Sequence, residues 1–265
     1  MSYAPSKGIT RPVYSQASAP LKIQKPFYPE ASGVCHSVIV HTAGGMVGGD
    51  RLGLDLHLQP QSQVLVTTTA ASKIYRSQGA FGHQTTHIQV EQSACMEWLP
   101  QETIVFNGAL YRQDLRVELA PDSIWVGWDI TRFGRSARGE QFLQGTWRSH
   151  TEIWRNGLPL WLDRQWLPAG PEILQSPHGL AGYPVIGAFV IIGYPVSPEI
   201  TAQIRTLWRS ETSGQVGVTR LLQGLLCRYR GHSSQDARRW FIEVWKHLRP
   251  RYLGCNACLP RVWTG

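Results

Sequence analysis

Short apolar or alternating runs, separated by turn-forming residues, recur through the first half of the chain and constrain its fold more than any other feature. In 52–58, for example, leucines alternate with glycine and polar residues, which is typical of a half-buried strand. No helical pattern long enough for a βαβ crossover separates the runs, and this disfavours a parallel Rossmann-type fold. The sequence predicts an all-β sandwich or stacked-sheet structure, with strands at 37–41, 52–58, 64–69, 85–91, 115–119 and 124–130.

The later part of the chain predicts one hairpin and two helices. Asn156-Gly157 is a typical hairpin pair, with the strand returning at Trp161. One helix is expected to begin at the cap Ser197 and end near Thr212. The other starts at Ser234, carries Trp240 and Trp245 on its apolar face, and is stopped by Pro250.

A glycine-rich turn lies directly before the strand at 52–58. Its four glycines permit positive φ angles and close backbone approach. A phosphate-binding loop would need a lysine that opens a helix, whereas here Asp50 stands in that place and a strand follows. We therefore interpret the segment as a turn that leads into a strand. Its glycines are Gly44, Gly45, Gly48 and Gly49.

Composition indicates a cytoplasmic protein with a sizeable core. The 265 residues are 42% hydrophobic, no run approaches the length of a membrane span, and the first residues lack the pattern of a signal peptide. Five cysteines in a long chain favour reduced thiols. Residues 1–20, rich in Ser, Pro and Ala, are expected to form a flexible arm, and 21–265 a single domain.

The net charge of +8 is concentrated in the C-terminal quarter. From Arg205 onward there are eleven Lys and Arg against three Asp and Glu. These basic residues form no dense run and match no nucleic-acid-binding motif, so we expect an acidic protein partner and no nucleic acid or membrane.

Motifs for catalysis or tight metal binding are weak. The Gly-x-Ser-x-Gly pattern of serine hydrolases is absent from the sequence. Cys35 and His36 are neighbours, and on a strand neighbours point to opposite faces, so we expect a core or edge cysteine. The Cys255-x-x-Cys258 pair lacks a second pair for a zinc site. His83 and His87 would lie roughly 13 Å apart along a strand.

Acidic residues within apolar surroundings are a further group of candidates. Asp129 follows Trp128, and a carboxylate there needs a partner or a wet cavity, because burial of an isolated charge costs several kcal/mol. Arg135 or Arg138 is the expected partner. Glu102 and Glu140 present the same choice between a structural ion pair and a functional carboxylate.

Several of these segments together resemble one family. His41–Arg51, Thr67–Ser77, Glu97–Phe106, Gly134–Glu140 and Leu259–Trp263 are similar to the urease accessory protein family UreD, also called UreH, in the same order over residues 21 to 264. In this resemblance the four glycines of the turn and Arg135 are structural motif residues.

The resemblance implies a non-enzymatic maturation factor. UreD proteins join UreF and the GTPase UreG, bind apo-urease, and help to insert two nickel ions at a carbamylated lysine. The family fold is mainly β, with elongated stacked sheets and two short helices toward the C-terminus. An internal water-filled route for nickel has been proposed for the family.

On this basis we expect no tightly bound cofactor, no catalytic residue, and nickel only in transit. Oxygen ligands that bind weakly suit transfer better than a closed Cys/His cage. The candidates for transit are Asp50, Glu102, Asp129 and Glu140.

Three alternatives remain open. A stand-alone nickel carrier would bind the metal tightly without a partner. A β-fold enzyme would hold a small anionic substrate at Lys73, Arg76 and the glycine turn. A nucleic-acid binder would show a steep salt dependence.

Overall fold

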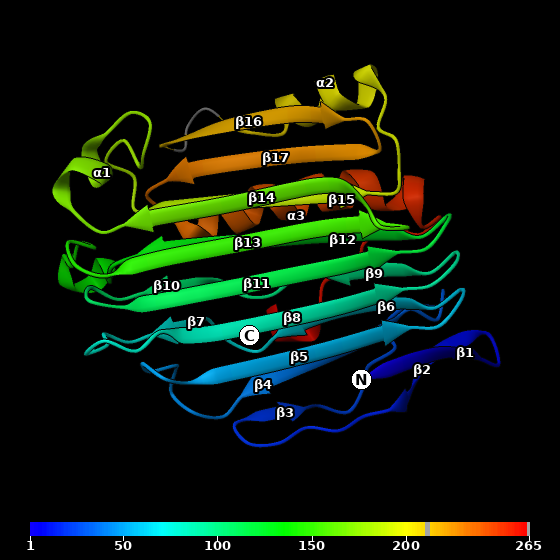
Figure 1. Cartoon of the computed structure of the whole chain (residues 1–265). Coiled ribbons are helices and arrows are strands. Elements are labelled where there is room, and N and C mark those ends of the chain that lie inside the picture. The colour runs from blue at the N-terminus through cyan, green and yellow to red at the C-terminus, as the bar shows by residue number, and fades with distance from the viewer. Residues whose placement is uncertain (210–212, 264–265) are drawn as a thin grey trace.

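Two β-sheets face each other in the computed structural model, which describes residues 1–209 and 213–263 (Figure 1). In the described residues, sheet A contains, in spatial order, β14 (Leu158–Pro168), β13 (Thr146–Arg155), β11 (Leu110–Leu119), β8 (Gly82–Val90), β5 (Arg51–Leu58), β1 (Ser2–Ser6) and β2 (Ile9–Tyr14). Sheet B contains β16 (Gly214–Leu221), β17 (Gly224–Gly231), β15 (Val185–Ile192), β12 (Ile124–Phe133), β9 (Cys95–Trp98), β6 (Gln63–Thr68), β4 (Cys35–His41) and β3 (Leu21–Ile23), with β10 (Thr103–Val105) and β7 (Ser72–Ile74) pairing beside β12. The mainly β fold class is confirmed.

From β4 to β13 the longer strands alternate between the two sheets, while the short β7 and β10 pair at the side of sheet B. Strands that neighbour each other in a sheet are therefore separated in the chain by a strand of the opposite sheet and pair in parallel, as in β5 with β8 and β6 with β9. Each intervening strand of the opposite sheet serves as the crossover that a helix supplies in a βαβ unit. The predicted hairpin is confirmed between β13 and β14, where Asn156 and Gly157 have φ angles of 51° and 74°.

The N-terminal arm was predicted incorrectly. Residues 2–14 form β1 and β2, and Ser2 and Tyr3 pair in parallel with the end of β5. Tyr3 is fully buried, and the N-terminal ammonium donates to the carbonyl oxygen of Asp55 at 2.7 Å. The prolines of this segment suggested disorder, but β2 is an edge strand, and edge strands tolerate proline.

The helices partly match their prediction. α2 (Pro198–Thr206) begins at the cap Ser197 and ends at Thr206; Thr212, the predicted end, lies outside the described residues. α3 (Ser234–Tyr252) begins as predicted but is 19 residues long and continues through Pro250. A short α1 (Pro171–Gln175) was not predicted, since five residues carry no helical period. In the described chain, no helix has the length and apolar character needed to cross a membrane.

The apolar core has three parts. α3 packs on β12, β15 and β17 of sheet B, behind the sheets in the view of Figure 1, and buries Trp240 and Trp245 as core residues. Two further clusters lie between the sheets. One lies around Leu58, Ile88 and Ile153, toward the carboxyl ends of the parallel strands. The other surrounds Tyr111, Phe133 and Trp147 at the opposite ends.

Candidate functional site: a polar cavity between the sheets

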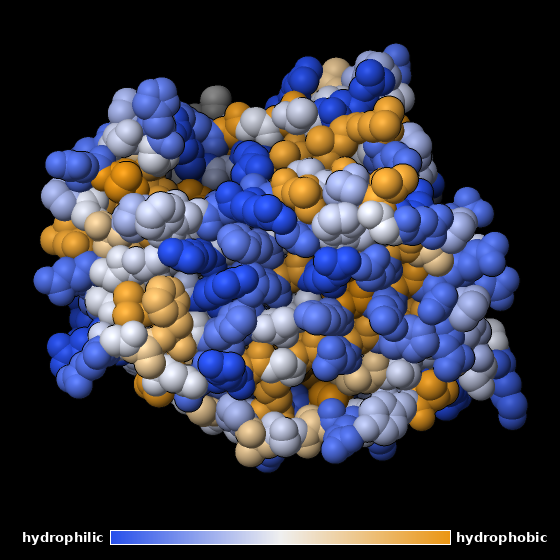
Figure 2. Space-filling view, in the orientation of Figure 1, coloured by the Kyte–Doolittle hydropathy of each residue, from blue (hydrophilic) through white to orange (hydrophobic). Residues whose placement is uncertain are grey.

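A cavity of about 1080 Å³ lies between the sheets, between the two apolar clusters just described. Its lining reaches from the glycine-rich turn beside β4 and β7, across the inner faces of both sheets, to β14 and β17. The cavity therefore crosses the strands and spans most of the width of the sandwich. The outer face of sheet A is a separate surface, and Figure 2 shows hydrophilic residues across its middle.

One side of this cavity is a straight row of polar side chains on sheet A, here called the polar row. Its members are paired in register on adjacent strands: Gln84 on β8, Gln113 on β11, Ser149 on β13 and Gln165 on β14. At these inward positions the neighbouring residues on the same face are mostly apolar, as Tyr111 is beside Gln113. The row lines the cavity and supplies amide and hydroxyl oxygens across four strands.

Asp129 faces the polar row from β12. The Gln113 side-chain amide donates to both the Asp129 carboxylate and the Ser149 hydroxyl, the latter at 2.9 Å. Burial raises the pKa of Asp129 to about 6; the hydrogen bond from Gln113 opposes the shift and the charge of Asp163 adds to it. The expectation that Arg135 or Arg138 is the partner of Asp129 is therefore wrong.

A second carboxylate lies where the polar row meets β14. Asp163 forms an ion pair of 3.1 Å with Arg228 on β17 and accepts a hydrogen bond of 2.8 Å from Gln165. On sheet B, Asp129, Ala188 and Arg228 are paired in register on β12, β15 and β17. Each of the two acids thus has a partner on the sheet opposite its own. The small Ala188 lies between Asp129 and Arg228 on sheet B.

Buried polar groups without partners also border the cavity. The indole nitrogens of Trp125 and Trp147 and the hydroxyl of Thr131 lack a hydrogen-bond partner in the described chain, and these residues are at most 2% exposed. Buried donors are rarely left without acceptors, and a cavity of this size with polar groups in its lining is suited to holding water.

The other three predicted transit acids do not line the cavity. Asp50 accepts from the backbone N–H of Val47 at 2.9 Å and closes the glycine turn. Glu102 forms an ion pair with Arg238 at the first turns of α3. Glu140 forms an ion pair of 2.7 Å with Arg135, and the hydrogen bonds from Arg135 lower the pKa of Glu140. The structure therefore brings Asp129 alone of the four to the cavity, and a role in nickel transit stays a prediction for each.

The glycine-rich turn forms the β4 side of the cavity. Gly45 has φ of 152°, and a Cβ atom there would lie 2.4 Å from the carbonyl oxygen of Lys73. The neighbouring Met46 N–H donates to that same oxygen at 2.8 Å. Glycine is therefore required for the turn to pack against β7.

The histidines and cysteines considered for metal binding have other contacts. His83 lies on β8 with its Nε2 2.6 Å from Asp114, and Cys35 and His36 are both buried. Over residues 1–209 and 213–263, no group of three or more His, Cys, Asp or Glu side chains is placed to hold a metal ion.

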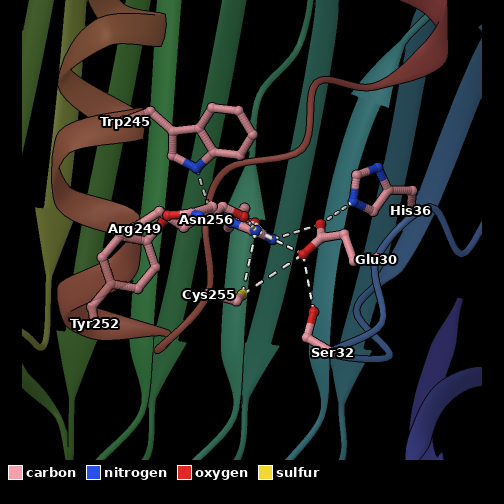
Figure 3. Close-up of polar contacts among 9 residues, drawn as sticks. Glu30, Ser32, His36, Trp245, Arg249, Tyr252, Cys255 and Asn256 are labelled. Carbon is pink, nitrogen blue, oxygen red and sulfur yellow. Dashed lines mark hydrogen bonds and ion pairs between the residues drawn. The ribbon is translucent and has the colours of Figure 1, made fainter.

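A buried ionic network on the far side of sheet B was missed from the sequence (Figure 3). Arg249 of α3 is fully buried and donates to Glu30 at 2.7 and 2.8 Å and to Glu97 at 3.0 Å. Trp245 and Tyr252 also donate to Glu97. The available signal was an arginine on the apolar face of the helix, since such a residue needs buried carboxylate partners.

The same network holds the C-terminal segment. Arg249 donates to the carbonyl oxygen of Asn256 at 2.6 Å and contacts the Cys255 sulfur at 3.4 Å. Burial raises the pKa of the Cys255 thiol, so the thiolate is disfavoured. These contacts assign the region around Cys255 a structural role.

Comparison with known proteins gives the family. A family model described as UreD urease accessory protein matches residues 1–264. The chain belongs to the UreD family of urease accessory proteins. Proteins named urease accessory protein UreD are similar over nearly the whole chain: 62% identical in Nostoc punctiforme, over 98% of this chain and 93% of that protein, and 57% identical in Acaryochloris marina, over 99% and 93%. A more distant one, from Synechocystis, is 41% identical over 91% of this chain and 90% of its own length.

Family membership confirms the resemblance seen in the sequence and implies a role in urease maturation. The relatives are named as accessory proteins.

Proposed function

We propose that this UreD-family chain supports urease maturation by passing nickel ions through the interior cavity to apo-urease, in a cytoplasmic complex with UreF and the GTPase UreG. The observation that carries the proposal is Asp129, a carboxylate that faces a polar row across a cavity spanning the sandwich. Between two apolar clusters, such a row has no packing advantage.

The donor chemistry of the cavity fits a cargo that is held weakly. Amide, hydroxyl and carboxylate oxygens are hard ligands, and nickel bound to a few of them keeps part of its water shell. Asp129, which faces the polar row from β12, and Asp163, beside the end of the row on β14, supply negative charge at two places in the cavity lining. A cation can then pass from one oxygen group to the next without a cage that would retain it.

The alternative of a stand-alone carrier is less well supported. A carrier needs a tight site, and soft or imidazole ligands give the highest nickel affinity. The Cys35, Cys95 and Cys227 thiols are buried, and burial raises the pKa of each. Tight nickel binding by the isolated chain would favour the carrier.

The maturation role is tested by complementation. Cells with a nickel-urease operon that lacks its own UreD receive this chain together with its native UreF and UreG, and urease activity and nickel content are measured. Restored activity supports the proposal. Lack of restoration, although the soluble chain co-purifies with UreF and UreG, contradicts it.

The cavity is tested with a matched pair of variants. Asp129→Asn is expected to lower urease nickel content at normal complex assembly, whereas Asp122→Asn, at an exposed acid outside the cavity lining, is expected to leave it unchanged. Equal nickel content in both variants would remove Asp129 from the route.

A further inference from the structure

The Asp163–Arg228 ion pair links the two sheets at the end of the cavity. Arg228 lies on the inner face of β17, and its guanidinium Nη2 reaches the carboxylate of β14 at 3.1 Å. The arginine side chain is 48% exposed and the aspartate side chain 13%. The pair therefore lies at the rim, where the polar row opens between β14 and β17.

The same carboxylate is positioned for a cation that comes along the row. Gln165, the last member of the row, donates to Asp163 Oδ2, while Arg228 contacts Oδ1. In the interior, Asp129 accepts from the side-chain amide of Gln113 and forms no ion pair with another described residue. One acid thus carries a fixed counter-ion and the other does not.

Three oxygen-bearing side chains line this part of the cavity: Asp129, Asp163 and Thr131. Thr131 follows Asp129 on the same face of β12, and its hydroxyl is 1% exposed and lies beside the Asp129 carboxyl, whose pKa it lowers, without a hydrogen bond of ordinary geometry to any described residue. On sheet B, the residue in register between Asp129 on β12 and Arg228 on β17 is Ala188 on β15, whose side chain is a single methyl group. Two carboxylates and a hydroxyl oxygen are ligands of the kind that a hydrated divalent cation takes. The cavity also has room for the water molecules that such an ion keeps.

We propose that Asp129, Asp163 and Thr131 form a transient site for a divalent transition-metal ion, and that Arg228 occupies Asp163 in the ion-free protein and returns to it to release the ion. This inference rests on the proposed function and adds to it a residue that sets the affinity. A built-in cation that competes for Asp163 keeps the site weak. Loss of that competition makes the site tighter and slower to empty.

The test is titration of the purified full-length chain with Ni²⁺ as the sole metal, followed by calorimetry. Arg228→Gln is expected to bind Ni²⁺ about fivefold more tightly than the unaltered chain, the gain that release of one part-exposed ion pair allows. Arg220→Gln, an exposed arginine of β16 outside the cavity lining, is the matched control and is expected to bind as the unaltered chain does. Equal affinity of the two variants would overturn the inference.

Two further variants separate competition from a general loss of structure. Arg228→Lys keeps the charge and is expected to retain the weaker affinity. Asp163→Asn is expected to lower Ni²⁺ affinity, and in combination with Arg228→Gln to abolish the gain. A gain that survives without the Asp163 carboxylate would refute the site, and so would unchanged binding by Asp163→Asn alone.

The failure of this inference differs from failure of the nickel route. If Asp129→Asn lowers urease nickel content but Arg228→Gln leaves Ni²⁺ affinity unchanged, the route stands and the arginine is structural. If Arg228→Gln tightens Ni²⁺ binding as expected while no cavity variant alters urease nickel content, the metal site stands and the route through it is wrong.

Discussion

Replacing Arg249 by methionine is expected to destabilise the chain strongly. The guanidinium is fully buried and satisfies two carboxylates, Glu30 and Glu97, and the carbonyl oxygen of Asn256. Methionine fills much of the volume but removes the shared cation of two buried carboxylates, of which Glu30 keeps only His36 as a side-chain partner from the buried interior of the described chain. Loss of one partner of a buried ion pair costs about 3 to 5 kcal/mol in the free energy of unfolding, so we expect about 4 kcal/mol.

The measurement is urea unfolding followed by tryptophan fluorescence. Arg239→Gln on the same helix is the control: its side chain is 64% exposed and lies 3.8 Å from Asp236, so less than about 0.5 kcal/mol is expected. Adding Glu97→Gln to Arg249→Met removes one of the stranded charges and is expected to recover part of the loss, because the two residues are coupled. A loss below about 1 kcal/mol for Arg249→Met would refute the reasoning.

Three further outcomes are expected from urea midpoints. The pKa of Asp129 is raised from 3.8 to about 6, so its contribution to the free energy of unfolding is full below pH 3.8 and is lost as the pH rises through 6. The resulting decrease in the free energy of unfolding is at most about 3 kcal/mol, and Asp129→Asn is expected to remove it. For Glu30, burial alone would raise the pKa, but hydrogen bonds from His36 and Arg249 outweigh it and lower the pKa to about 2. Its contribution is therefore full above pH 4.5 and lost as pH falls toward 2, and Glu30→Gln removes that acid sensitivity. Gly45→Ala is expected to lower the free energy of unfolding by at least about 2 kcal/mol. Gly53→Ala is the control, because a Cβ atom there would have no other atom within 4 Å, and it is expected to change the free energy of unfolding by less than about 0.5 kcal/mol. Equal urea midpoints for the two variants would contradict the packing argument.

Local patterns in the sequence predicted individual strands well because each strand carries its own alternation. The Asn156-Gly157 hairpin and the cap at Ser197 were also readable, since turn and cap chemistry is local. The N-terminal strands were missed because edge strands tolerate the Ser and Pro content that suggested disorder. Parallel pairing was missed because it depends on the path of the chain between sheets.

The cavity depends on register, which no single segment reveals. Gln113 interrupts an inward apolar pattern between Tyr111 and Leu115 of its own strand, and this signal was present in the sequence. The alignment of Gln84, Gln113 and Ser149 into one row follows only from pairing β8, β11 and β13 without a shift. The partner of Asp129 was missed for the same reason, because Gln113 is distant in sequence and comes from the opposite sheet.

Passage of nickel across the sandwich through the interior cavity is the step on which the proposed function depends. It is tested most directly by filling the cavity with Ala188→Phe, between Asp129 and Arg228, and measuring the nickel content of urease purified from the complemented cells. Gln89→Phe, which places the same ring at an exposed position of β8, is the control. Nickel content is expected to fall for the Ala188 variant alone while the accessory complex assembles normally. Full nickel loading of urease with the cavity filled would contradict the account.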